Sequence, residues 1–192
     1  MNDPDHGLIV GSKAGDRVAF GKLISKHYDM VYAVSFGILR NREEALDATQ
    51  SVFLKVFHEI QNFHGQSKFK TWLYRIAANA AIDECRKRRP AEPLEGEAVF
   101  ESRGASPMEA ASRLEIRGLI EKAMNALSPE HRAVFVMREW NELSYDEIAE
   151  ILHISLGTVK SRLARARQAL KCELESMMQQ APARLPVWNP AE

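Results

Sequence analysis

A short segment near the C-terminus concentrates positive charge. Between positions 158 and 171 the sequence holds no acidic residue, and its basic residues are Lys160, Arg162, Arg165, Arg167 and Lys171. The fork of an arginine side chain can donate paired hydrogen bonds to guanine edges and to phosphate oxygens. The segment therefore has the chemistry of a nucleic-acid contact.

Two helices across a tight turn are expected to position these charges. Ser144 and Glu147 form a capping box, which begins the first helix. The turn follows at residues 153–155, where His153 tolerates a positive φ better than most residues and Ser155 can cap the second helix. This is the outline of a helix-turn-helix DNA reader.

The second helix has the two faces that such a reader needs. Its apolar residues recur at i, i+4, i+7 and i+11 and share one face: Val159, Leu163, Ala166 and Leu170. Ser161, Ala164 and Arg165 fall opposite this stripe. The helix can bury one side and enter a groove with the other, although an exposed amphipathic helix at a protein interface would have the same pattern.

A second basic stretch, from Lys68 to Arg89, is interleaved with aromatic residues. It carries seven basic side chains and two acids, and the aromatic residues in and beside it are Phe63, Phe69, Trp72 and Tyr74. Basic groups beside aromatic rings are typical of single-stranded nucleic-acid sites, where the rings stack on bases. The alternative is that these rings, Phe69 and Trp72 above all, are buried in a small core.

The same stretch predicts a helix that is capped by Ser67 and ends at Pro90. A polar stripe follows one face of this helix at i, i+4, i+8 and i+11: Arg75, Asn79, Asp83 and Arg86. The stripe is either an internally paired surface row or part of the nucleic-acid site.

The periodic patterns predict an all-α protein with two small helical domains, of which the C-terminal one holds the helix-turn-helix. The predicted parts are a mobile N-terminus (1–15), a first domain (16–90), a flexible acidic linker (91–111), a second domain (112–175) and a flexible tail (176–192).

Local signals set the helix boundaries within these domains. Asn41 and Glu44 begin a helix that is expected to bury Phe53 and Phe57, whereas Gly37 weakens the last turn of the helix before it. In the second domain, Ser128 and Pro129 supply a cap and a first-turn proline.

Composition excludes several classes of protein. The 26 basic and 26 acidic residues balance, and the two cysteines support neither a disulfide framework nor a zinc site. No nucleophile constellation or phosphate-cradling glycine loop is visible, so we expect no enzyme, no catalytic residue, no bound metal and no cofactor. The sequence lacks a signal peptide and an apolar run of roughly 20 residues, which predicts a cytoplasmic protein without membrane insertion.

Three blocks of the sequence closely resemble signatures of bacterial sigma factors of the extracytoplasmic-function (ECF) group. This group keeps only the second and fourth conserved regions. The blocks are residues 47–57, 69–89, and 127–139 together with 143–167. The resemblance covers most of the chain, and it implies a promoter-specificity subunit that directs RNA polymerase core to start transcription.

The resemblance also implies a role for each block. The residues that would grip the clamp helices of the polymerase beta-prime subunit are Asp47, Gln50, Phe53, Leu54 and Lys55, where spacing alone favours a solvated face. The residues that would capture an extruded base of the −10 element are Phe63, His64, Ser67, Lys68 and Lys70, backed by Arg75, Asn79, Asp83 and Arg86. The residues that would read or clamp the −35 element are Thr158, Lys160, Ser161, Arg162, Ala164 and Arg165.

The partners implied by the resemblance are the beta-prime clamp helices and beta flap of RNA polymerase core, promoter DNA, and an anti-sigma factor. The alternative is a sigma-like decoy that binds an anti-sigma factor without recognising a promoter. The basic residues of both DNA blocks argue against the decoy.

Overall fold

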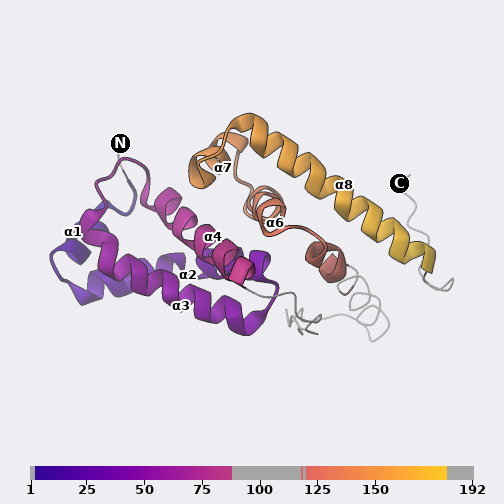
Figure 1. Cartoon of the computed structure of the whole chain (residues 1–192). Helices are drawn as coiled ribbons and strands as arrows, with labels where there is room; N and C mark the ends of the chain where they lie inside the picture. The colour runs from indigo at the N-terminus through magenta and orange to yellow at the C-terminus, as the bar shows by residue number, and fades with distance from the viewer. Residues whose placement is uncertain (1–2, 88–117, 119, 181–192) are drawn as a thin grey trace, which may run out of the picture.

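The computed structural model describes residues 3–87, 118 and 120–180, and every regular element in them is helical (Figure 1). The elements are α1 (His6–Lys13), α2 (Arg17–Leu39), α3 (Arg42–Glu59), a 3-10 turn η1 (Ile60–Asn62), α4 (Phe69–Lys87), helical residues 120–125, α6 (Pro129–Phe135), a π-helical turn η2 (Val136–Trp140), α7 (Tyr145–Leu152) and α8 (Leu156–Gln180). The predicted all-α class is confirmed.

The helices up to residue 87 form the first bundle, in which α2 packs against both α3 and α4. Asp16 caps α2 by accepting from the backbone amides of Val18 and Ala19. Asn41 caps α3 by accepting from the Glu44 amide at 3.1 Å, as predicted. These caps fix where the chain turns and therefore how the long helices lie against one another.

The N-terminal segment differs from the prediction. Residues 1–15 were expected to be mobile, but α1 packs on α2 and buries Ile9, while Asp5 is only 1% exposed. Gly11 allows this close approach, because a Cβ there would stand 2.9 Å from the Cβ of Ala19. The prediction was wrong for the described part of the segment because a buried polar network, rather than an apolar stripe, holds it in place.

The helices from residue 120 onward form the second bundle, and local signals predicted its boundaries correctly. Ser128 caps α6 with proline at the first turn, and Ser144 and Glu147 form the reciprocal capping box of α7. His153 ends α7 with a φ of 51°. Ser155 accepts from the Thr158 amide at 3.1 Å where α8 begins.

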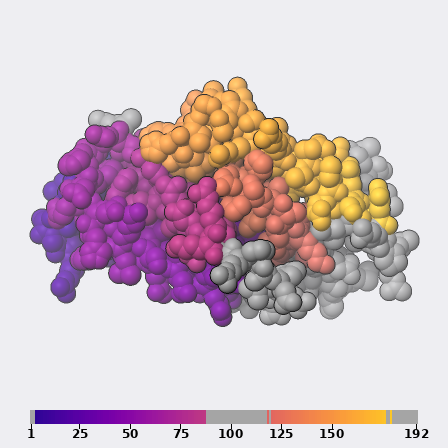
Figure 2. Space-filling model, in the orientation of Figure 1, coloured from indigo at the N-terminus to yellow at the C-terminus, as the bar shows by residue number. Residues whose placement is uncertain are grey.

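The two bundles share one continuous hydrophobic core. Buried residues of α2 and α4 cluster with Val134 of α6, Ile148 of α7 and Leu163 of α8. Figure 2 shows α6, α7 and the start of α8 in direct contact with the first bundle, while the C-terminal part of α8 extends beyond it. The buried Arg132 crosses the boundary, where it donates to the carbonyl oxygen of Ile38 at 2.6 Å and to that of Leu127 at 3.0 Å.

Two predicted segments fall largely outside the described residues. The linker over 91–111 lies entirely outside them, as does the tail from residue 181 onward. The tail was predicted to begin at residue 176, but α8 continues to Gln180. Among the described helices, none combines the length and apolar character that crossing a bilayer requires.

Candidate nucleic-acid interface

The outer face of α8 presents the residues predicted to read the −35 element. Val159, Leu163 and Ala166 are buried against the bundle, as predicted. The side chains on the other faces reach solvent in whole or part: Thr158, Lys160, Ser161, Arg162, Ala164 and Arg165. The hydroxyl groups of Thr158 and Ser155 lie 2.8 Å apart, so Thr158 belongs to the helix start as well as to this surface.

The five basic residues of α8 separate into two kinds. Arg167 binds Glu139 of η2 at 2.5 Å, and this hydrogen bond raises the pKa of Arg167. Lys171 pairs with Glu175 at 3.8 Å. Within residues 3–87 and 120–180, no acid forms an ion pair with Lys160, Arg162 or Arg165. The cations of the first turns are therefore available to an external anion.

The candidate −10 surface begins with a loop whose aromatic residues are buried. Phe63 and Phe69 are 8% and 1% exposed, and they pack with the half-buried Trp72 at ring-centroid distances of 5.2 to 5.7 Å. Tyr74 is buried as well. The core interpretation of these aromatic residues was therefore right, and Phe63 is not available as a stacking platform in this structure.

The residues of this loop that reach solvent are polar or basic. His64, Lys68 and Lys70 are exposed, and Ser67 is half-buried. Ser67 does not cap α4 as predicted: its hydroxyl donates to the Lys68 carbonyl at 3.4 Å. The amide of Phe69, which opens α4, donates instead to Asp3 Oδ2 at 2.6 Å.

The polar stripe on α4 is partly occupied by the second bundle. Arg86 donates to Glu130 of α6 at 2.7 Å and lies 3.6 Å from Asp83. Arg75 donates to the carbonyl oxygen of Glu150 in α7 at 3.2 Å. Asn79 and Asp83 are exposed. The stripe is thus both an internally paired row and part of the boundary between the bundles.

Electrostatics also link the loop of the candidate −10 surface, residues 63–68 (the −10 loop below), to α7. The backbone amide and hydroxyl of Ser144 lower the pKa of Glu147, and the positive charges of Lys68 and Lys70 lower it further. On α6, burial works against the charged form of Glu130, but the hydrogen bond from Arg86 keeps its pKa below the ordinary value. Acidic groups of the second bundle therefore neutralise part of the candidate −10 surface.

A third candidate surface lies on α3. Asp47, Gln50 and Lys55 are exposed there, and Leu54 is 63% exposed although it is apolar. Phe53 faces the other way: it is 8% exposed and stacks on Tyr28 at 6.1 Å, so it supports this surface from beneath.

The α3 surface also includes a residue that the sequence pattern did not assign to it. Phe57 was expected to be buried but is 52% exposed, with one edge against Phe20. Helical spacing places Phe57 beside Leu54, so these two exposed apolar side chains form one small patch on α3.

Two polar residues that contact the ends of the −10 loop were not identified from the sequence. Asp3 binds the amide of Phe69, and Lys13 donates to the carbonyl oxygen of Phe63 at 2.5 Å. These partners lie 66 and 50 positions apart in the chain, so no local pattern could reveal the contacts.

Comparison with known proteins places both bundles in one family. The family models "Sigma-70 region 2" and "Sigma-70, region 4" match residues 23–91 and 117–170. The chain is 35% identical over 175 residues to the ECF RNA polymerase sigma factor SigW of Bacillus subtilis (strain 168), which covers 86% of this chain and 94% of that protein.

Solved structures share the fold. CnrH, in a complex with the cytosolic domain of CnrY, matches with a TM-score of 0.68 and 25% identity, over 91% of this chain and 99% of that one. The sigma factor RpoE of Bartonella quintana, in a complex with the anti-sigma factor NepR, has the same fold, with a TM-score of 0.64, 24% identity, and coverage of 81% and 96%. The chain belongs to the family of ECF RNA polymerase sigma factors.

Proposed function

We propose that this protein directs RNA polymerase core to specific promoters by reading a −35 duplex with α8 and capturing a −10 strand with the α4 loop. In this proposal, residues 16–90 and 112–175 are the two functional domains. The proposal rests mainly on the geometry of α8, a capped helix whose apolar side is buried. On its other faces, Lys160, Arg162 and Arg165 reach solvent without acidic partners in the described chain.

The −35 contact combines two kinds of interaction. Arg165 lies opposite the buried stripe and is placed to reach base edges when the helix enters a major groove. Lys160 and Arg162 lie on the flanks, where they can bind phosphates and fix the register of the helix. Ala164 is small enough to let the backbone approach a thymine methyl group.

The −10 contact follows from the exposed part of the loop. An extruded base would meet His64, Ser67 and Lys68, with the buried Phe63–Phe69–Trp72 cluster as the floor of the loop. Flipping a base out of a duplex costs about a few kcal/mol, which the contacts to the captured base offset. Selective binding of the open strand would then melt the promoter without a catalytic side chain, because a sigma factor is not an enzyme.

The α3 surface supports the proposed contact with the polymerase core. Leu54 and Phe57 offer apolar anchors, and Asp47, Gln50 and Lys55 form a polar rim, an arrangement common at protein interfaces. We assign this surface to the beta-prime clamp helices, and we assign the beta flap to the second bundle. RNA polymerase core is cytoplasmic, so the site of action is the cytoplasm.

Promoter binding requires the two bundles to separate. In the packed arrangement, Arg86 of the −10 surface binds Glu130, and Arg75 binds the carbonyl oxygen of Glu150. Docking of each bundle at its own site on core would hold them apart and free these side chains. The two DNA contacts would then act together, since fixed separation gives each a high effective concentration for its element.

An anti-sigma factor is the remaining partner in this proposal. The relative from Bartonella quintana was solved with the anti-sigma factor NepR. An anti-sigma factor acting on this chain would cover the α3 surface and so compete with core polymerase. The decoy function is less consistent with the three outward cations of α8, which an inhibitor-binding decoy would not need.

Reconstitution with core polymerase tests the proposal. The purified chain should direct transcription from promoters selected by the reconstituted holoenzyme, with footprints over both elements. Leu54→Asp should weaken core binding, whereas a triple alanine variant at Lys160, Arg162 and Arg165 should bind core normally and lose the −35 footprint. A chain that binds no core polymerase would contradict the proposal, and core binding without a promoter footprint would favour the decoy.

A further inference from the structure

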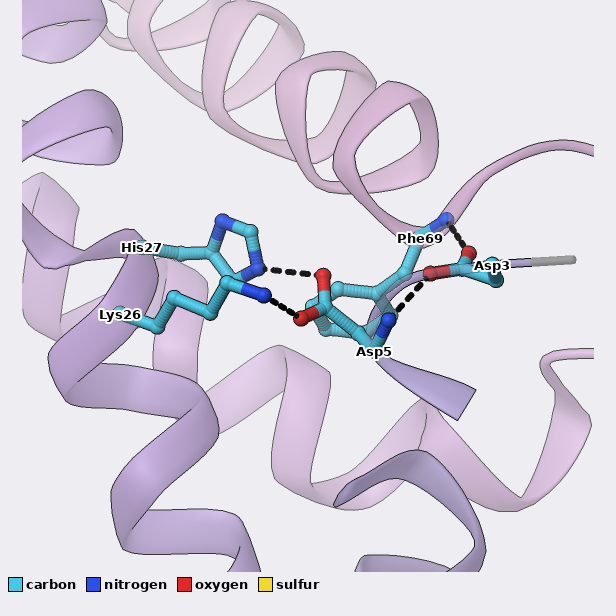
Figure 3. A network of polar contacts seen from close by, with 5 residues as sticks. All are labelled: Asp3, Asp5, Lys26, His27 and Phe69. Atoms are coloured by element: carbon cyan, nitrogen blue, oxygen red, sulfur yellow. Dashed lines mark hydrogen bonds and ion pairs between the residues drawn. The ribbon is translucent and has the colours of Figure 1, made fainter. Parts of the chain in front are cut away.

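The N-terminal segment, residues 3–13, contacts both ends of the −10 loop. At the far end, Asp3 Oδ2 accepts from the amide of Phe69 at 2.6 Å, where α4 begins (Figure 3). At the near end, Lys13 Nζ donates to the carbonyl oxygen of Phe63 at 2.5 Å, and the Lys13 carbonyl accepts from Gln61 at 2.7 Å. One short segment therefore fixes both boundaries of residues 64–68.

The segment is itself firmly anchored to α2. Asp5 Oδ2 lies 2.8 Å from His27 Nε2, and Asp5 Oδ1 forms an ion pair with Lys26 (Figure 3). Burial opposes the ionised form of Asp5, but the hydrogen bonds from Lys26 and His27 hold its pKa below the ordinary value. Asp5 donates its amide to Asp3 Oδ1 at 2.8 Å, so the anchor also orients the Asp3 carboxylate.

The same network reaches the aromatic floor of the loop. The His27 ring packs on Phe69 at 5.5 Å between centroids, and Phe69 packs edge-on against Phe63 at 5.6 Å. The loop ends are thus held both by hydrogen bonds from the Asp3 and Lys13 side chains to the backbone and by ring packing. Between them, residues 64–66 and Lys68 remain exposed, and Gly65 provides a positive φ of 70°.

We propose that residues 3–13 form a brace that sets the conformation of the −10 loop, with Asp3 and Lys13 as positioning residues for strand capture. The proposal rests on the proposed function. The brace does not touch DNA. It holds the anchored ends of a short loop whose exposed centre would bind the extruded base.

Such a brace would preorganise the loop for binding. A loop that must be ordered on binding loses affinity, because the ordering cost is subtracted from the contact energy. A carboxylate at the first turn of a helix binds backbone amides strongly and also interacts favourably with the helix dipole. Because Asp3 and Lys13 order the loop when the protein folds, less free energy is lost to loop ordering when the base binds.

The closing experiment compares Asp3→Ala and Lys13→Met with two controls, in chains that carry any affinity tag at the C-terminus. Asp3→Asn keeps one acceptor oxygen for the Phe69 amide but loses the charge and the second acceptor, which serves the Asp5 amide, so its effect should lie between wild type and Asp3→Ala. Ser128→Ala removes the hydroxyl that caps α6, which makes no contact with the brace. It matches the loss of a capping hydrogen bond without disturbing the brace.

The first readout is amide hydrogen exchange of the free protein, which does not depend on the proposed function. Exchange at residues 64–69 should rise in Asp3→Ala and Lys13→Met, stay near wild type in Ser128→Ala, and leave α3 protected in all variants. Unchanged exchange at 64–69 in both brace variants would overturn the proposal.

The second readout is strand capture by the reconstituted holoenzyme. Open-complex formation in Asp3→Ala should fall roughly tenfold, the factor expected for one charge-assisted hydrogen bond. Its discrimination among −10 base substitutions should also flatten, with the affinity for core and the −35 footprint retained. Wild-type discrimination in both brace variants would overturn the brace alone. A wild-type chain that opens no promoter would instead overturn the proposed function, and the brace with it.

Discussion

Gly37 of α2 lies directly against Val136 of η2: a Cβ built on Gly37 would stand 2.6 Å from Val136 Cγ1 and 2.9 Å from Val136 Cγ2. It would also stand 3.0 Å from the ring of Trp140. Only a residue without a side chain allows this approach, and the contact joins the first bundle to the second. The sequence marked Gly37 as a weak point in a helix, whereas its structural role is to let the other bundle pack against it.

Gly37→Ala should weaken the packing between the two bundles and raise the population of separated forms. Alanine favours a helix interior by up to about 1 kcal/mol over glycine, but overpacking against a stiff valine costs about 1 to 3 kcal/mol. The radius of gyration in solution scattering should rise, and core polymerase should bind faster because its binding sites are already apart. Gly21→Ala is the matched control, since Gly21 lies in the same helix with no atom within 4 Å of a built Cβ.

A second substitution checks the cause of this effect. Adding Val136→Ala to Gly37→Ala removes the clashing methyl groups and should restore the compact form. A Gly37→Ala variant that scatters like wild type would show that the boundary yields to the extra methyl group.

Glu130→Gln should release Arg86 from the second bundle. Arg86 and Glu130 are joined at 2.7 Å across the boundary, and this contact holds a residue of the proposed −10 surface. Because exposed ion pairs are weak, we expect only a roughly two- to fivefold gain in −10 strand binding by the free protein. Fluorescence anisotropy with a single-stranded −10 probe measures it.

The control for this variant removes the same charge elsewhere. Glu84 pairs with Lys87 at 3.2 Å within α4, so Glu84→Gln changes the net charge without touching the boundary. Equal gains in the two variants would mean that net charge, rather than release of Arg86, is responsible.

How much of this arrangement the sequence predicts depends on the range of the interactions. Capping residues act within three or four positions, so Asn41, Ser128 and Ser144 and the left-handed His153 were all identified correctly. The burial of Val159 and Leu163 followed from helical periodicity for the same reason. These local rules predicted both candidate helices and the outward direction of the basic face.

Interactions between distant residues were beyond the same reasoning. The polar composition of the N-terminus predicted a mobile segment. Its packing could not be predicted, because the burial of Asp5 depends on contacts with Lys26 and His27 rather than with its neighbours in the sequence. The sequence around Phe63 is compatible both with a ring that stacks on bases and with a ring that packs on Phe69. The burial of Phe63 is decided by the tertiary cluster, and the contact between Gly37 and Val136 is equally invisible in either helix alone.

Tyr74 should make stability depend on alkaline pH. Burial raises the pKa of Tyr74 to about 12, and its hydroxyl donates to Asn141 Oδ1 at 3.2 Å across the boundary. Because the folded state holds this proton more tightly than the unfolded state, the stabilisation is complete below about pH 10 and is lost as pH rises toward 12. Urea unfolding at stepped pH measures the slope.

Tyr74→Phe isolates this contribution. The variant should lose about 1 kcal/mol at neutral pH, the size of one hydrogen bond, and should lack most of the decline between pH 10 and 12. The exposed Tyr28 provides the comparison, since Tyr28→Phe should leave the alkaline slope in place. A decline of equal steepness in Tyr74→Phe would assign it to other groups.

Arg165→Ala and Arg167→Ala should affect different properties, promoter reading and stability, although the residues are only two positions apart on α8. Arg165 faces solvent with no acidic partner in the described chain, so its loss should reduce −35-dependent initiation roughly tenfold and leave core binding intact. Arg167 is bound to Glu139, so its loss should loosen α8 from η2 and spare most of the −35 readout. Transcription from promoters with intact and substituted −35 elements measures the first effect, and thermal unfolding measures the second. If Arg167→Ala abolished −35 selectivity while Arg165→Ala did not, the reading face of α8 would have to be rotated by about 200° about the helix axis, since each residue turns the helix by roughly 100°.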